Sequence, residues 1–226
     1  MKLEKITDRP ARSYDDSCGA ALALDIVGER WALLVMRELM LGPRRFGDLR
    51  ANLPGISANV LTQRLEGLEA AAVIRRRKLP PPASVQVYEL TDWGREAEPI
   101  VLELGRWGAR LPTQDPTLPL SGVSMMLSFR AMFDAARAGD LDVSIAFRFG
   151  EDIFSVAVRE CVLTSERGEP LAPDVEVTGK PPAVAGLVYG FASMEDLEAE
   201  GALKIAGDRA ALMRFAAIFE LPPKAG

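Results

Sequence analysis

The chain has 226 residues, 48% of them hydrophobic and 26% charged, which predicts a soluble globular protein with one large core or two ordinary ones. It contains no histidine and two cysteines, so a disulfide framework, a His-dependent catalytic triad and a zinc site are excluded. A net charge of −5 argues against nucleic-acid binding if the charge is spread evenly.

The charge is not spread evenly. Residues 1–110 carry 17 basic and 15 acidic residues, a net charge of +2, whereas residues 111–226 carry 10 and 17, a net charge of −7. Residues 42–79 alone hold eight basic and three acidic residues. A polyanion would be attracted to such a patch, so the two halves are expected to differ in role.

The N-terminus lacks the apolar core of a signal peptide, and no apolar run is long enough to span a bilayer. We therefore expect a cytoplasmic protein with no membrane partner. No phosphate-binding glycine loop and no paired nucleophile and base appear, so neither an enzyme nor a cofactor is expected.

Three helices are expected ahead of residue 54. Apolar residues recur at helical spacing over residues 21–26 and again over residues 31–40. A short helix follows from about Phe46 to Leu53, and a Pro-Gly pair closes it. Ser57 then stands where its hydroxyl group can cap the next helix.

The helix after Ser57 has an apolar face and a polar face. Leu61, Leu65, Leu68 and Ala72 follow the helical repeat and predict the buried face. Two short helices joined by a glycine-containing turn are typical of a helix-turn-helix. Asn and Gln can bond an adenine edge, and Thr or Val can contact a thymine methyl group. The side chains expected to read bases are Ser57, Asn59, Val60, Thr62 and Gln63.

A basic hairpin is expected next. The run VIRRRKLPPPASVQVYELT indicates a strand, a proline-rich tip and a second strand, with four successive cations on the first arm. Alone, that arm could be an edge strand protected by its charge. After a helix-turn-helix it predicts the wing of a winged helix. The expected phosphate contacts are Arg44, Arg45, Arg64, Arg75, Arg76, Arg77 and Lys78.

A further helix is expected in TDWGREAEPIVLELGRWGARL, with Ile100, Leu104 and Trp107 on one face. That face could pack on its own domain or form a dimer seam. We favour the seam, because a symmetric dimer would place two recognition helices about one DNA turn apart. Residues 111–122, with three prolines, predict a linker.

The second half predicts an α+β domain at residues 120–226. LDVSIAFRFG and IFSVAV alternate apolar and polar residues and indicate two strands of a hairpin. A helix with Met125 and Phe129 precedes them, and another helix begins near Asp208. We expect helices packed on an antiparallel sheet.

The stretch CGAALALDIVGERWALLVMRELMLGPRRFGDLRANLPGISANVLTQRLEGLEAAAVIRRR, followed by VYELTDWGREAEPIVLELGRWG, resembles the HxlR-type branch of winged-helix transcriptional regulators, related to the MarR group. The domain would cover residues 14–112. The resemblance implies a homodimeric regulator that binds double-stranded operator DNA, commonly near its own promoter, and we expect it to act as a repressor. The helix from about Ser57 would enter the major groove, and the wing would follow the phosphates.

The second half, with GALKIAGDRAALMRF near its end, resembles the sterol-carrier-protein-like domain. This implies an apolar tunnel for a lipid or another hydrophobic small-molecule effector. The same residues could instead form a plain core. They are Met126, Phe129, Phe147, Phe154, Leu187, Phe191 and Phe215.

Members of the HxlR type typically carry a cysteine before the first helix, here Cys18, and in some members this thiol senses oxidants or electrophiles. The helix N-terminus would favour the thiolate, whereas Asp15 and Asp16 would oppose it. A thiol sensor and a partly buried structural cysteine are both open. Cys161 alternates with its neighbours and is expected inside a strand.

Two classes of function follow. The first is a DNA-binding regulator that responds to a hydrophobic ligand or to thiol oxidation. The second is a carrier of lipids or hydrophobic ligands that uses the winged helix for protein interaction. The four-cation wing favours the first, because a carrier has no use for it.

Overall fold

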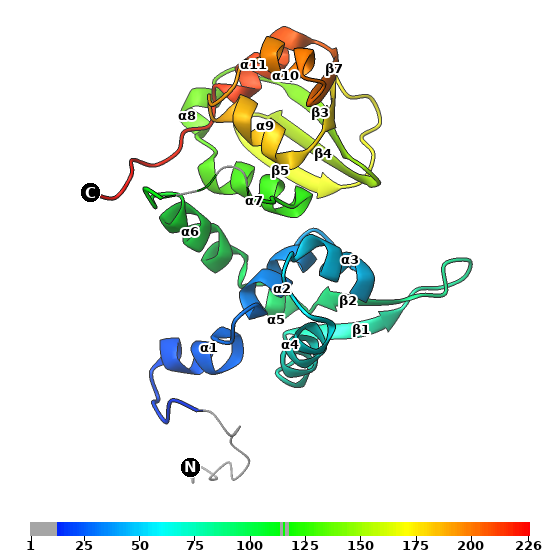
Figure 1. Cartoon of the computed structure of the whole chain (residues 1–226), viewed down its shortest axis with the longest axis vertical. Helices are drawn as coiled ribbons and strands as arrows, with labels where there is room; N and C mark the ends of the chain where they lie inside the picture. The colour runs from blue at the N-terminus through cyan, green and yellow to red at the C-terminus, as the bar shows by residue number, and fades with distance from the viewer. Residues whose placement is uncertain (1–12, 114, 116–117) are drawn as a thin grey trace. The chain divides into compact units, whose positions relative to one another are not determined.

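The structure is a computed structural model that describes residues 13–113, 115 and 118–226. The chain divides into two compact units. Unit 1 extends to Leu39 and resumes over Pro43–Arg95, and unit 2 comprises Met40–Gly42 and Glu96–Gly226. Unit 1 is a winged helix-turn-helix and unit 2 packs helices on a sheet, so the predicted α+β fold class is confirmed (Figure 1).

Unit 1 is the helix-turn-helix followed by its hairpin. Its elements are α1 (Gly19–Val27), α2 (Ala32–Leu39), α3 (Phe46–Asn52), α4 (Ala58–Ala70), β1 (Ile74–Lys78), β2 (Gln86–Leu90) and α5 (Asp92–Arg95). β1 and β2 pair antiparallel, from Ile74 opposite Leu90 to Lys78 opposite Gln86. We call this hairpin the wing.

The rotation of α4 follows the predicted leucine repeat. Leu61, Leu65 and Leu68 are buried, and Ser57 caps the helix by accepting the Val60 N–H at 3.3 Å. Ala72 departs from the prediction, because α4 ends at Ala70 and Ala72 is exposed with a φ of +57°.

A Schellman-type motif explains this ending. The Ala72 N–H bonds to the Glu69 carbonyl and the Val73 N–H bonds to the Leu68 carbonyl, both at 2.9 Å. The left-handed residue that turns the chain from α4 into β1 is therefore an alanine, where glycine is the usual choice. With no glycine at this point, the sequence gives no sign that the helix ends there.

Unit 2 is a five-stranded sheet with helices on one face. Its elements are α6 (Glu98–Gly108), α7 (Gly122–Met132), α8 (Ala135–Ala138), β3 (Val143–Phe149), β4 (Asp152–Arg159), β5 (Val162–Arg167), β6 (Val175–Gly179), α9 (Pro181–Val188), α10 (Met194–Ala199), β7 (Leu203–Gly207) and α11 (Arg209–Ala216). The strand order is β5-β4-β3-β6-β7.

The sheet is mixed, although an antiparallel sheet was expected. β3 pairs antiparallel with β4 and parallel with β6, while the β4–β5 and β6–β7 pairs are antiparallel. The reason is the connection at residues 168–174, which returns the chain from the edge strand β5 to the far side of β3.

Cys161 lies in a turn, not inside a strand as predicted. Glu160 and Cys161 have φ values of +50° and +58°, and Arg159 pairs with Val162, so these two residues form the loop of a tight hairpin. This conformation usually selects Gly or Asn. Neither is present here, so the turn carries no signal in the sequence.

The division between the units precedes the predicted linker. We expected α6 to belong with residues 14–112, but Val101, Leu102 and Ala109 pack against the core of unit 2. α6 thus has a second apolar stripe beside the one formed by Ile100, Leu104 and Trp107. Residues 114, 116 and 117 of the linker lie outside the described residues.

Six of the seven residues assigned to an apolar tunnel lie in the packed core of unit 2. The ring of Phe129 lies 5.4 Å from that of Phe147 and 5.2 Å from that of Phe215, centroid to centroid. Phe191 is 68% exposed and lies at the surface. Aromatic side chains fill the space between the helices and the sheet, so the structure favours the plain core.

No helix of the described residues is long and apolar enough to cross a membrane.

We expect Phe129→Ala to lower the free energy of unfolding of unit 2 by about 3–5 kcal/mol, because it removes a buried ring and leaves a cavity. Urea unfolding, followed by hydrogen exchange in β3 and β4, measures this. Phe191→Ala is the matched control and should change stability by less than about 0.5 kcal/mol. Similar losses in the two variants would contradict a core position for Phe129.

Candidate nucleic-acid interface

The predicted base-reading side chains gather at the N-terminal end of α4. Asn59, Thr62 and Gln63 are exposed and spaced at i, i+3 and i+4, so they form one strip on the helix surface. Val60 is half-buried beside them. Ser57 is exposed, but its oxygen is engaged in the helix cap, which leaves its O–H as a donor.

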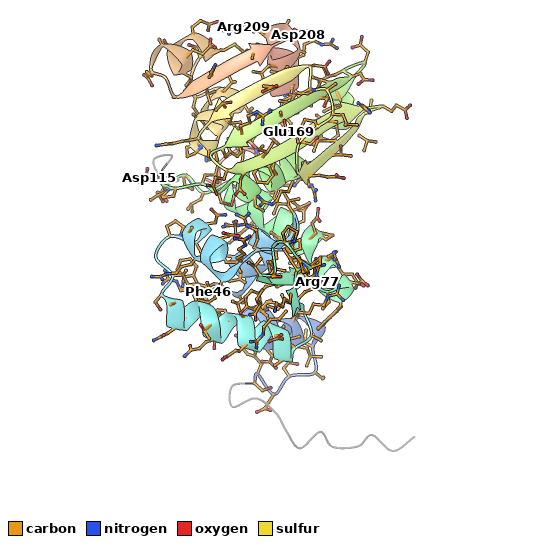
Figure 2. All side chains as sticks on the ribbon, turned by 90° about the vertical axis from the view of Figure 1, so that its right-hand side faces the viewer. Phe46, Arg77, Asp115, Glu169, Asp208 and Arg209 are labelled. Carbon is orange, nitrogen blue, oxygen red and sulfur yellow. The ribbon has the colours of Figure 1, made fainter. Side chains whose placement is uncertain are left out.

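The wing exposes all four of its predicted cations. Arg75 and Arg77 share one face of β1, while Arg76 and Lys78 lie on the other, because side chains alternate along a strand. Figure 2 labels Arg77 on this hairpin, and Phe46 marks the start of α3 in the same unit. Within the part of the chain that the structure describes, Lys78 forms no ion pair.

Glu89 of β2 binds two of these arginines. Its Oε1 atom accepts from Nε of Arg75 at 2.8 Å, and its Oε2 atom lies 2.9 Å from Nη2 of Arg77. The Glu89 side chain is 8% exposed, whereas that of Arg75 is 62% exposed. Burial alone would raise the pKa of Glu89, but the hydrogen bonds and charges of the two arginines lower it overall.

Glu69, in the last turn of α4, binds the third arginine. Its Oε2 atom lies 2.6 Å from Nε and 2.5 Å from Nη2 of Arg76, and its Oε1 atom accepts from the Arg76 backbone N–H at 3.3 Å. The hydrogen bond to Arg76 lowers the pKa of the Glu69 carboxyl group. This ion pair joins α4 to the wing.

Neither carboxylate is among the site residues predicted from the sequence. Aligning the hairpin about its proline-rich tip would have placed Glu89 opposite Arg75. No comparable signal existed for Glu69, because its approach to Arg76 depends on the left-handed turn at Ala72.

The other predicted phosphate contacts differ in their exposure. Arg45 is exposed at the start of α3, and Arg64 is half-buried with its Nη2 atom 3.1 Å from Glu29. The prediction that Arg44 contacts phosphate is corrected, because this residue is only 9% exposed. Its backbone pairs with Tyr88 through bonds of 2.9 and 2.8 Å, which draws it into the base of the wing.

Cys18 is the N-cap residue of α1 and is exposed. The backbone N–H groups of Ala20 and Ala21 lower the pKa of its thiol. The Asp16 carboxylate accepts the Cys18 backbone N–H at 2.9 Å. Across residues 13–113, 115 and 118–226, no three His, Cys, Asp or Glu side chains gather as a metal site would require.

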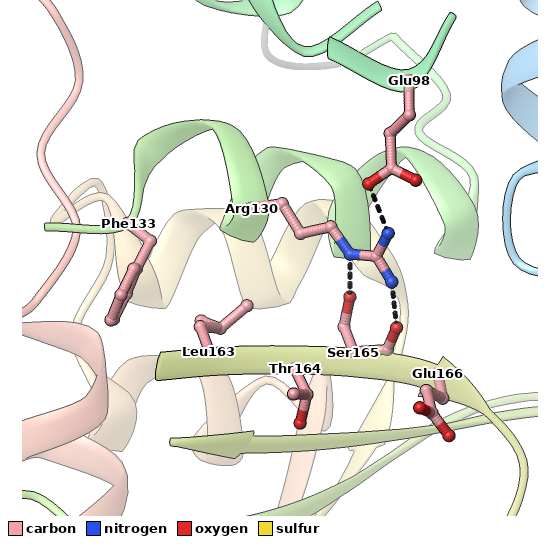
Figure 3. A pocket seen from close by; sticks show the side chains of 7 residues that line it. All are labelled: Glu98, Arg130, Phe133, Leu163, Thr164, Ser165 and Glu166. Carbon is pink, nitrogen blue, oxygen red and sulfur yellow. Dashed lines mark hydrogen bonds and ion pairs between the residues drawn. The ribbon is translucent and has the colours of Figure 1, made fainter. Parts of the chain in front are cut away.

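In unit 2, Arg130 of α7 connects three elements (Figure 3). Its Nε atom donates to Oγ of Ser165 at 2.8 Å, its Nη2 atom donates to the Ser165 carbonyl, and its Nη1 atom lies 2.5 Å from Glu98 of α6. These residues line a cavity of about 420 Å³ together with Phe133 and Leu163. Arg130 thus holds the first turn of α6 against α7 and β5.

The C-terminal residues contact the three residues that follow α6, beginning with its C-cap Ala109. Lys224 donates to the carbonyls of Ala109 and Leu111 at 3.0 and 3.2 Å, and the Ala225 N–H bonds to the Arg110 carbonyl at 2.8 Å. A cation at this end also complements the helix dipole. The outer stripe of α6 stays exposed, with Trp107 at 75%.

Comparison with known proteins divides the chain in two. Residues 26–115 match the family model of the HxlR-like helix-turn-helix. Residues 122–225 match the model described as alkyl sulfatase C-terminal. The second match is to a family other than the sterol-carrier-protein-like one that we expected.

The relatives include an uncharacterized HTH-type transcriptional regulator of Bacillus subtilis, YvaP, which is 38% identical over 85 residues, or 38% of this chain and 79% of that protein. The solved redox regulator HypR, in its oxidized form, is 32% identical with a TM-score of 0.39 and covers 43% of this chain and 99% of its own. The sec-alkylsulfatase Pisa1 from Pseudomonas sp. is 19% identical with a TM-score of 0.42, over 45% of this chain and 16% of its own.

The identity to YvaP, over most of that regulator's length, agrees with the family match and with the winged helix of unit 1. The chain belongs to the HxlR-like helix-turn-helix family of transcriptional regulators.

Proposed function

We propose that this protein is a sequence-specific repressor that binds double-stranded operator DNA as a homodimer. The observation that carries the proposal is the exposed strip of Asn59, Thr62 and Gln63 on α4, beside a wing with four exposed cations. Its direct test is an electrophoretic shift with the DNA upstream of its own coding sequence.

Within this proposal, α4 reads the bases. Asn59 and Gln63 would bond adenine edges, and Thr62 and Val60 would contact thymine methyl groups. Ser57 would donate its O–H to a base or phosphate acceptor. The phosphate contacts come from Arg45, Arg64, Arg75, Arg76, Arg77 and Lys78, without the buried Arg44.

The homodimer is proposed to form through the outer stripe of α6. Ile100, Leu104 and Trp107 are exposed at i, i+4 and i+7 on one side of this helix, while its other side packs on unit 2. A second copy of the same stripe would bury both in a two-fold arrangement.

Unit 2 is proposed to act on DNA binding through α6 rather than by contacting DNA. Residues 111–226 carry a net charge of −7, which phosphates would repel. The residues first assigned to a ligand tunnel fill the core, which weakens the alternative of a lipid carrier. A small-molecule effector in the cavity beside Arg130 would touch Glu98 and so affect how α6 is held.

A thiol switch at Cys18 is a second candidate function. It is favoured by the exposure of this cysteine and by the lowered pKa of its thiol, since the thiolate is the species that reacts with oxidants.

Gln63→Ala should weaken binding to the cognate operator by about 1–3 kcal/mol and relax selectivity at one base position. Lys78→Ala should weaken binding to all sequences alike and flatten the slope of log K against log salt by about one unit. Fluorescence anisotropy with an operator and its single-base variants measures both effects. A uniform loss across sequences from Gln63→Ala would overturn its assignment to base reading.

Leu104→Glu should convert the dimer to a monomer and weaken operator binding, because two buried carboxylates would face each other in the seam. Sedimentation equilibrium measures the assembly state. Leu171→Glu is the matched control, since Leu171 is a fully exposed leucine elsewhere in unit 2. A dimer that survives Leu104→Glu would place the seam elsewhere.

A quinone electrophile, which adds to a single thiolate and needs no second thiol, should weaken operator binding by the wild-type protein and leave Cys18→Ser unaffected, with Cys161→Ser as the control that responds like the wild type. Because the pKa of Cys18 is lowered, its thiolate persists to lower pH in the folded chain. Iodoacetamide should therefore modify Cys18 at lower pH than in urea-unfolded protein. Equal responses to the quinone in Cys18→Ser and wild type would leave Cys18 with a structural role.

A further inference from the structure

The wing presents four cations, but three of them already have carboxylate partners. Arg75 and Arg77 share Glu89, and Arg76 is bound by Glu69. Both carboxylates lie inside the proposed DNA interface, one beneath the wing and one at the end of the recognition helix. A wing built only to maximise attraction for phosphates would not contain them.

These ion pairs change what the wing gains from DNA. An unpaired cation that meets a phosphate releases a condensed counterion, and this release drives binding and makes it depend on salt. If the pairs persist, Arg76 with Glu69 brings no net charge to the phosphates, and Arg75 and Arg77 with Glu89 bring one positive charge between them. An arginine that leaves its carboxylate must break an existing ion pair. In either case the arginine contributes less than its formal charge suggests.

The two carboxylates differ in how easily their partners can leave them. Glu89 is almost fully buried and stays beneath the wing, so its negative charge remains near any phosphate that Arg75 and Arg77 contact. Glu69 is 30% exposed and holds Arg76 through both its guanidinium group and its backbone N–H. Neither arrangement leaves an arginine free in the absence of DNA.

We propose that Glu69 and Glu89 lower the sequence-independent affinity of the wing for the DNA backbone. This inference rests on the proposed DNA-binding function and adds two residues that set its strength. Because these two carboxylates act on phosphate contacts, they lower the affinity for cognate and unrelated sequences alike. Discrimination between sequences is then left to the side chains of α4.

The test uses the full chain and a fluorescein-labelled duplex of about 30 base pairs and mixed sequence, since the proposed effect on phosphate contacts does not depend on sequence. Anisotropy is measured from about 20 to about 200 mM NaCl for the wild type, Glu69→Gln and Glu89→Gln. Each substitution keeps the size of the side chain and removes the charge. Circular dichroism checks the fold, and the Glu69 variant keeps the test valid if the buried Glu89 site does not tolerate glutamine.

We expect each variant to bind about tenfold more tightly near 100 mM salt, with a salt slope steeper by about one unit for Glu69→Gln and about one to two units for Glu89→Gln. Adding Arg75→Gln to Glu89→Gln should reverse part of this gain. Asp92→Asn is the control for net charge, because it removes an exposed carboxylate that pairs with Arg95 in α5, and should change affinity less than twofold or so.

Affinity that is unchanged or weaker in both Glu variants would overturn the proposal and assign the carboxylates to positioning the arginines. A gain from Asp92→Asn equal to theirs would also overturn it, because net charge alone would then explain the effect. If the wild type binds DNA and the Glu variants bind no more tightly, only this inference fails and the proposed function stands. A complete lack of binding by every variant at low salt defeats the proposed function as well.

Discussion

The burial of one leucine stripe decides what unit 1 can do. Leu61, Leu65 and Leu68 fix the rotation of α4 about its axis, and the amide and hydroxyl side chains on the other side are exposed as a consequence. The Ser57 cap fixes where the helix starts, and hence which residues occupy its first turns. The apolar packing supplies the stability, while the polar strip can vary without disturbing it. Because of this separation, proteins of one fold can differ in the DNA sequences they bind by changing only the polar strip.

Much of unit 1 could be predicted because its signals are local. A cap, a helical leucine repeat and a basic strand before a proline-rich tip each fall within a few residues. The Glu69–Arg76 pair could not be predicted, since it depends on how the chain turns at Ala72. Arg44 was misplaced for a similar reason, because its burial comes from a backbone bridge to Tyr88, far along the chain.

Unit 2 shows the limits of periodicity more clearly. The β3–β4 hairpin followed from strict alternation, whereas the parallel β3–β6 pairing depends on a return connection that no local pattern marks. α6 has two apolar stripes, and only the one that remains exposed was recognised. The stripe that packs on unit 2 places the helix with the second unit. The same periodicity in Met and Phe residues suits a tunnel or a core, and only the ring contacts around Phe129 separate the two.

The left-handed Ala72 has a consequence for how the protein would sit on a double helix. It is the turning residue between α4 and β1, and the Glu69–Arg76 pair spans the same turn. No flexible linker therefore separates α4, which is proposed to enter a groove, from the wing, which is proposed to follow the backbone. The two elements would approach as one rigid body, with the offset between groove and strand built into the protein. Such a reader has little freedom to adapt to a widened or narrowed groove. It would therefore favour sites whose unbound shape already fits, and local DNA geometry becomes part of what it recognises.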